Sequence, residues 1–293
     1  MTTIHLYLGA HKTASTHIQG IFLANRETLA RNGVALSAPQ DIRKTWLPRF
    51  FKYCNHQKEN QDKDELQSLQ SLLPDCGRWI LSEENIIGTS FDLSVMPGIY
   101  PLAENRIRAI ISLFPQCKVK LFFSLRSYDT FYRSAYTEVV RNRGFLKFSR
   151  FYDEERFKDN SWLNTVAGFA RALPQENITL WRFEEVRQLM PDVVQRITGI
   201  ADSKSLMDAY NPETTRPSLS AKTIKILNML HPVLNKKESL ALVERINNAY
   251  SIDKGHPAYE PFTKEQADAF KLQYEQDWIA IRNIYPNINI MQA

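Results

Sequence analysis

The sequence has few cysteines, and they follow no recognisable pattern. Cys54, Cys76 and Cys117 are odd in number and widely spaced, which predicts neither a disulfide framework nor a metal cluster. The six histidines show no metal-ligand spacing either, so we expect no metal.

Long apolar runs are also missing. No stretch approaches the roughly 20 apolar residues that a membrane span requires. Residues 1–9 lack the basic and apolar regions of a signal peptide. The sequence contains no repeats and no low-complexity segment. We therefore expect a cytoplasmic protein without a membrane span.

Neither sign of charge dominates the composition. The 37 Lys and Arg residues against 32 Asp and Glu give a net charge of +5. Charged residues make up 24% of the chain and hydrophobic residues 43%, which argues against disorder and predicts a real apolar core over 293 residues. The mild basic excess suits an anionic ligand and equally an ordinary soluble protein. We expect no nucleic acid polymer as a partner.

Short apolar runs alternate with helical patterns over the first 200 residues. We expect strands at 3–8, 78–82, 117–125 and 177–182, and helices at 15–32, 102–114, 127–143 and 161–173. This alternation predicts an α/β fold, with a parallel sheet of about five strands flanked by helices. Only helices are expected afterwards, at 218–231, 236–250 and 263–284. We therefore expect an α/β core over 1–200 and a helical C-terminal extension over 201–293 packed on the same domain.

A polar turn joins the first expected strand to the first helix. Its residues are Gly9-Ala-His-Lys-Thr-Ala-Ser-Thr16. The helix N-terminus offers backbone N–H groups, Lys12 offers a charge, and Thr13, Ser15 and Thr16 offer hydroxyls, which together suit a phosphate. The turn is not a Walker A motif, because Lys12 follows the glycine by three residues and the second glycine is missing. An ordinary helix capped by Ser15 or Thr16 is the alternative.

The turn and the Gln19 that follows resemble the 5′-phosphosulfate loop of sulfotransferases that use 3′-phosphoadenosine 5′-phosphosulfate (PAPS). The family usually has glycine where Ala14 stands, and alanine is compatible with the loop if its φ is negative. The resemblance implies that residues 12–16 (Lys12, Thr13, Ala14, Ser15 and Thr16) bind the cofactor.

A second cluster follows the expected strand at 117–125. Arg126 stands at the end of this strand, and Ser134 lies two helical turns later. An arginine and a hydroxyl suit a second phosphate, although a surface ion pair is the ordinary alternative. The resemblance implies that they bind the 3′-phosphate, with Arg216 as a further contact. The family often has proline where Tyr128 stands.

Two adjacent carboxylates, Glu83 and Glu84, follow the strand at 78–82. Transfer to a hydroxyl needs a base, and the resemblance maps Ser82 and Glu84 onto a bacterial Ser-x-Glu-Asn segment, making Glu84 catalytic together with Lys12. Glu83, or His11 in the turn, are alternative bases. Both carboxylates also suit the N-terminus of a helix.

These sites favour a sulfotransferase that transfers a sulfuryl group from PAPS, without a metal, to a hydroxyl or amine of a small-molecule, carbohydrate or lipid acceptor. The alternatives are an ATP-dependent P-loop kinase and an inactive nucleotide-binding protein on the same scaffold. Residues 37–75 are rich in aromatic and basic residues and either contact the acceptor or form a solvated amphipathic helix.

Overall fold

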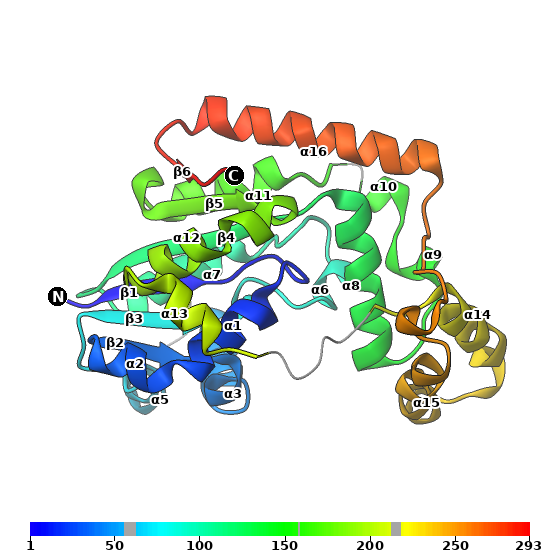
Figure 1. Cartoon of the computed structure of the whole chain (residues 1–293), viewed down its shortest axis with the longest axis horizontal. Coiled ribbons are helices and arrows are strands. Elements are labelled where there is room, and N and C mark those ends of the chain that lie inside the picture. Colours follow the sequence, from blue (N-terminus) through cyan, green and yellow to red (C-terminus); the bar gives the residue numbers. More distant parts are fainter. Residues whose placement is uncertain (56–62, 158, 212–217) are drawn as a thin grey trace.

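A central parallel sheet with helices on both faces forms the core of the molecule (Figure 1). The computed structural model describes residues 1–55, 63–157, 159–211 and 218–293. Every strand pair is parallel, and the order is β2-β3-β1-β4-β5-β6. The strands are β1 (Thr3–Tyr7), β2 (Val34–Ser37), β3 (Arg78–Ser82), β4 (Lys118–Leu125), β5 (Ile178–Arg182) and β6 (Asn289–Ile290). The α/β prediction is confirmed, with six strands where about five were expected.

The helices divide between the two faces of the sheet. One face packs against α1 (Ser15–Ala24), α2 (Arg26–Arg31), α12 (Val186–Thr198) and α13 (Ser203–Asp208). The other packs against α3 (Pro39–Ile42), α4 (Trp46–Asn55), α5 (Lys63–Gln70), α7 (Ala103–Leu113), α8 (Tyr128–Arg143), α11 (Trp162–Ala172) and α16 (Lys264–Ile284). The remaining helices are α6 (Asp92–Val95), α9 (Phe148–Phe151), α10 (Glu154–Phe157), α14 (Ala221–Leu230) and α15 (Lys236–Ala249). Short 3₁₀ turns span Glu84–Ile86, Gln175–Asn177, Phe183–Glu185, His231–Val233 and Ile252–Lys254.

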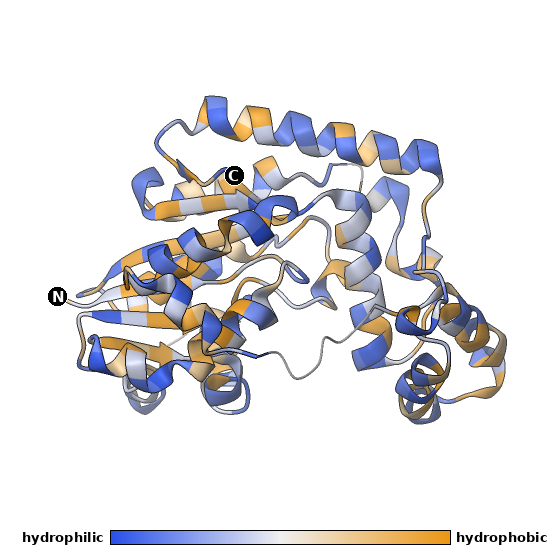
Figure 2. Ribbon diagram, in the orientation of Figure 1, coloured by the Kyte–Doolittle hydropathy of each residue, from blue (hydrophilic) through white to orange (hydrophobic). Residues whose placement is uncertain are grey.

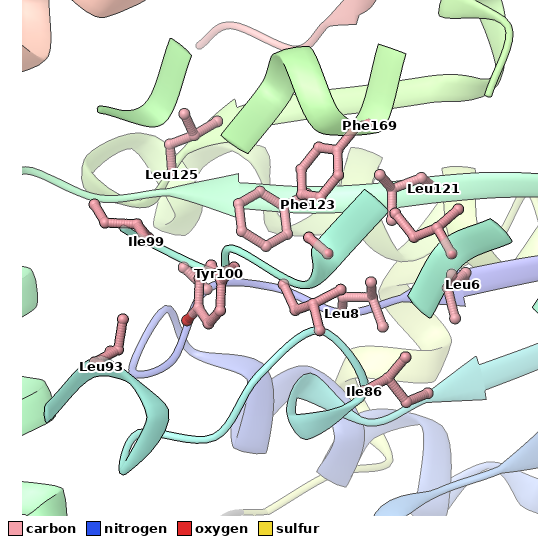
Figure 3. Close-up of a cluster of buried hydrophobic side chains, with 14 of the residues drawn as sticks. Leu6, Leu8, Ile86, Leu93, Ile99, Tyr100, Leu121, Phe123, Leu125 and Phe169 are labelled. Carbon is pink, nitrogen blue, oxygen red and sulfur yellow. The ribbon is translucent and has the colours of Figure 1, made fainter. Parts of the chain in front are cut away.

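Burial on both faces explains why the central strands are rich in apolar residues. Leu6 and Leu8 from the β1 segment and Leu121 and Phe123 from β4 lie fully buried beside Phe169 of α11 (Figure 3). Each such side chain contributes about 1.5–3 kcal/mol through its removal from water. The apolar strands therefore hold their carboxyl ends at one edge of the sheet, where the polar clusters begin.

The helix predicted over 15–32 is wrong as a single element. It is broken at Asn25, whose backbone leaves the helical conformation (φ −110°). The Asn25 side chain donates hydrogen bonds to the carbonyls of Ile21 and Leu206, at 2.8 and 2.7 Å, and so ties α1 to α13. The chain then turns at Gly33 (φ +70°) into β2, a strand that the sequence pattern did not predict.

The C-terminal residues return to the core. Helix α16 packs on α8 and α11, and β6 pairs with β5 at the edge of the sheet. Helices α14 and α15 pack on each other, and α15 also contacts α8. Figure 2 shows hydrophilic and hydrophobic residues interspersed along α16, as expected for a helix with one face on the core. In the described ranges, no helix has both the length and the apolar character needed to cross a membrane. The division near residue 200 stays a prediction.

Candidate functional site

The turn between β1 and α1 lies at the carboxyl edge of the sheet, between β3 and β4. The N–H groups of Leu8 and Ala10 extend the β1 ladder to the carbonyls of Phe122 and Ser124, at 3.2 Å each. Beyond them the backbone folds tightly, and the Thr13 hydroxyl donates a 2.6 Å hydrogen bond to the Ala10 carbonyl. The buried Thr13 therefore shapes the turn from inside.

Three residues of this turn have left-handed backbone conformations. Gly9, Lys12 and Ala14 have φ values of +57°, +65° and +62°. A Cβ atom on Gly9 would lie 3.1 Å from the Thr13 hydroxyl oxygen, so glycine is favoured there both by conformation and by space. The condition of a negative φ at Ala14 is not met, because the tight turn imposes the conformation that glycine adopts most easily.

The N-terminus of α1 has no side-chain cap. Ala14 itself is the N-cap residue, so the alternative in which Ser15 or Thr16 caps the helix is wrong. Ser15 is buried and Thr16 is exposed. The first N–H groups of a helix have no partner within the helix, and those of α1 follow Lys12 by three residues and more in the chain. This end of α1 is suited to an anion.

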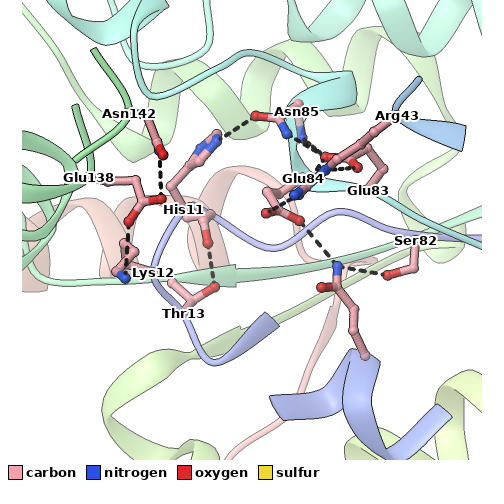
Figure 4. Close-up of polar contacts among 12 residues, drawn as sticks. His11, Lys12, Thr13, Arg43, Ser82, Glu83, Glu84, Asn85, Glu138 and Asn142 are labelled. Carbon is pink, nitrogen blue, oxygen red and sulfur yellow. Dashed lines mark hydrogen bonds and ion pairs between the residues drawn. The ribbon is translucent and has the colours of Figure 1, made fainter. Parts of the chain in front are cut away.

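Lys12 is paired with a carboxylate that the sequence did not indicate (Figure 4). Its Nζ lies 3.4 Å from Oε2 of Glu138 on α8, and Asn142 donates a 2.8 Å hydrogen bond to Oε1 of the same carboxylate. Burial acts to raise the pKa of Glu138, but the charge of Lys12 and the hydrogen bonds from Asn142 and Lys12 lower it further than burial raises it. Glu138 is therefore an ionised partner for Lys12.

Arg126 connects the two predicted phosphate sites. Its Nη1 donates to the Lys12 carbonyl, and its Nε donates to the Thr130 hydroxyl at 3.0 Å. The guanidinium also lies over the ring of Phe183, at 4.4 Å. Burial lowers the pKa of Arg126 to about 10, which leaves the side chain charged at neutral pH. Arg126 and the turn that carries Lys12 thus form one cluster.

Ser134 lies on α8, as predicted, and is buried. Among the described residues no hydrogen bond joins its hydroxyl to Arg126, whereas Arg126 bonds to the Lys12 carbonyl. Arg216, the other predicted contact, lies outside the described residues.

The two adjacent glutamates have different surroundings (Figure 4). Glu83 is fully buried and accepts hydrogen bonds from Arg43 Nε at 2.6 Å and from the Asn85 backbone N–H at 3.0 Å. Burial raises the pKa of Glu83, although the bonds from Arg43 act in the opposite direction. Glu84 is 14% exposed and accepts from Arg43 at 2.9 Å and from Gln19 Nε2 at 3.1 Å. Glu84 is thus the more accessible of the two carboxylates.

His11 has hydrogen bonds at both ring nitrogens. Nδ1 lies 2.6 Å from the Tyr100 hydroxyl, and Nε2 lies 3.2 Å from Oδ1 of Asn85. The Asn85 amide donates through Nδ2 to the Glu83 carboxylate, so its Oδ1 must accept and His11 Nε2 must carry a proton. His11 thereby anchors the turn to two neighbouring segments.

The region 37–75 contributes one residue to this site. Arg43, just after α3, bridges Glu83 and Glu84. In α4, Trp46 and Phe50 are buried whereas Lys52 is exposed, which is the amphipathic arrangement expected as the alternative to acceptor binding. Residues 56–62 lie outside the described residues.

A separate cavity of about 230 Å³ lies on the α7 and α11 side of Tyr100. Asn105, Asn164 and Thr165 are among its polar lining residues, and none of the predicted phosphate-binding residues lines it. The described residues contain no group of three or more His, Cys, Asp or Glu arranged to hold a metal ion. The three cysteines are free.

The comparisons with known proteins found similarity to solved structures. No protein-family model and no curated protein matches the sequence. The chain is similar to a sulfotransferase from Alicyclobacillus acidocaldarius, with 14% identity and a TM-score of 0.42, over 82% of this chain and 95% of that one. It is also similar to retinol dehydratase in complex with androsterone and inactive cofactor PAP, with 12% identity and a TM-score of 0.36, over 99% of this chain and 82% of that one. Such values do not establish a family.

Proposed function

We propose that the protein is a sulfotransferase that transfers the sulfuryl group of PAPS to a hydroxyl or amine acceptor. One observation carries this proposal: Lys12 and Arg126 stand after the adjacent strands β1 and β4, and Arg126 bonds to the Lys12 carbonyl. PAPS has anionic groups at its 5′ and 3′ ends, and the cluster offers one cation for each.

The donors at the site fit such a nucleotide. The uncapped N-terminus of α1 offers N–H groups for the 5′-phosphosulfate, together with Lys12 and the Ser15 and Thr16 segment. A guanidinium has five N–H donors, and Arg126 uses two of them in bonds to Thr130 and Lys12. Its other donors have no bond among the described residues and are suited to a 3′-phosphate. Ser134 and Arg216 are proposed as further contacts to that group.

When bound, PAPS would supply a sulfuryl group on a phosphate leaving group. Lys12 and the N–H groups of α1 would neutralise the charge that develops on the leaving oxygen. Glu84 would accept the proton of the acceptor. Arg43 and Gln19 hold the Glu84 carboxylate in a fixed orientation. The acceptor is proposed to be a carbohydrate, a lipid or another small molecule.

Calorimetric titration of two nucleotides tests this assignment. We expect adenosine 3′,5′-bisphosphate to bind at least about tenfold more tightly than adenosine 5′-phosphate, because charge-assisted bonds to the 3′-phosphate are worth about 1.5–3 kcal/mol each. Arg126→Ala should erase most of this preference. Arg150→Ala on the exposed part of α9 is the matched control and should preserve it. Equal affinities of the wild-type protein for the two nucleotides would exclude the PAPS assignment.

A further inference from the structure

The Lys12–Glu138 pair places a carboxylate where an anionic ligand is expected to bind. Glu138 lies on α8 one turn after Ser134 and points toward Lys12 (Figure 4). Both side chains are largely shielded from solvent, with 27% of Lys12 and 21% of Glu138 exposed. The carboxylate of Glu138 offsets the charge of Lys12. A phosphate bound at the N-terminus of α1 would therefore compete with Glu138 for Lys12.

The contacts of Glu138 with Lys12 and with Asn142 differ in length. The Lys12 contact, at 3.4 Å, is longer than the 2.7–2.9 Å typical of a charge-assisted hydrogen bond, whereas the Asn142 contact has an ordinary length of 2.8 Å. Asn142 also stands on α8, one turn from Glu138. The carboxylate is thus oriented by its own helix, and the flexible Lys12 side chain is the member of the pair that can leave.

We propose that Glu138 is a positioning residue that pairs with Lys12 and competes for it with the 5′-anion of a nucleotide. This inference rests on the proposed function and assigns to the same site a specificity for nucleotides with a 5′-anion. Only a ligand with an anionic group at its 5′ end replaces Glu138 as the partner of Lys12. Weaker anions at this end have to compete with a carboxylate that is already in place.

Glu138→Gln isolates the competition, because glutamine keeps the size and the acceptor for Asn142 while it removes the charge. We expect adenosine 3′,5′-bisphosphate and adenosine 5′-phosphate to bind the variant about two- to fivefold more tightly than the wild-type protein. Adenosine 3′-phosphate has no 5′-anion and should bind both proteins equally. A residue that only supports the fold would lower affinity on substitution, whereas this one should raise it.

Two further variants separate pairing from a general charge effect. In a Lys12→Ala background, Glu138→Gln should give no gain, because the competition acts through Lys12. Glu27→Gln changes the net charge equally, but Glu27 is exposed on α2, so it should leave all three affinities unchanged.

Calorimetric titration of the three nucleotides into these proteins decides the question. Unchanged or weaker binding of adenosine 3′,5′-bisphosphate by Glu138→Gln would overturn the inference, and so would an equal gain in Glu27→Gln. A wild-type protein that binds none of the three nucleotides would overturn the proposed function itself.

Discussion

The left-handed conformation of Ala14 makes a prediction that depends only on the fold of the turn. With φ +62° and ψ 16°, the alanine Cβ approaches the following carbonyl oxygen, which costs about 1–2 kcal/mol. Glycine avoids this cost but loses up to about 1 kcal/mol through its greater freedom in the unfolded chain. The partly buried methyl group of Ala14 is worth a few tenths of a kcal/mol more. We therefore expect Ala14→Gly to raise the free energy of unfolding by about 0.5 kcal/mol.

An alanine in a regular helix provides the matched control. Ala269 is exposed within α16, where glycine costs about 1 kcal/mol relative to alanine. Ala269→Gly should therefore lower the free energy of unfolding by about 1 kcal/mol, so the two variants should differ by about 1.5 kcal/mol.

Guanidinium unfolding followed by circular dichroism measures both effects. For 293 residues the entropy of unfolding is about 0.6 kcal/mol/K, so 0.5 kcal/mol moves Tm by only about 1 °C and the denaturant midpoint is the more useful quantity. If Ala14→Gly destabilises the protein as much as Ala269→Gly does, residue 14 is not left-handed and the description of the turn is wrong.

Three further outcomes are expected. Lys12→Ala should abolish sulfuryl transfer from PAPS while circular dichroism stays unchanged; a variant with most of the wild-type turnover would exclude the loop assignment. Glu84→Gln should lower turnover by about two to four orders of magnitude with little change in nucleotide affinity, and the same loss in Glu83→Gln alone would move the base by one position. Burial lowers the pKa of His5 to about 4, and its Nδ1 lies 2.6 Å from the Ile197 carbonyl. Because the unfolded chain then binds more protons between pH 6.5 and 4, the free energy of unfolding should fall by about 2–3 kcal/mol from pH 7 to 4.5, and denaturation of His5→Gln should lack this part of the slope.

The sequence predicted those elements whose pattern is strong. The central strands are short apolar runs followed by polar residues, and α16 begins at a Thr263 capping box, so their positions were confirmed closely. The strands β2 and β6 have four and two residues, which is too short for a periodic signal. The break at Asn25 was missed because the apolar spacing continues across it, and its cause is a contact with Leu206 far along the chain.

The candidate site was predicted in its position but not in its pairings. Each predicted segment follows a strand of a parallel sheet, and such segments necessarily meet at one edge. The partners of these residues come from distant parts of the sequence. Lys12 pairs with Glu138 across 126 positions, and Arg43 reaches Glu83 across 40. Glu138 stands one helical turn after Ser134 on α8. No residue between them indicates from the sequence that Glu138 contacts the turn at Lys12.

The sequence could not show which of Glu83 and Glu84 faces α1. Gln19 of α1 donates to both Ser82 and Glu84, whereas among the described residues it has no bond to Glu83, which lies between them; Arg43 reaches both glutamates. This alternation is the two-residue period of an extended chain, and Glu83 is extended, with φ −164° and ψ 109°. In a strand with one solvent-exposed face, polar and apolar residues alternate along the sequence and indicate this period. Trp79, Ile80 and Leu81 of β3 are apolar and buried, so the residues just before Ser82 have no polar position to indicate which side faces α1. The side of each glutamate follows only once α1 is placed over the sheet.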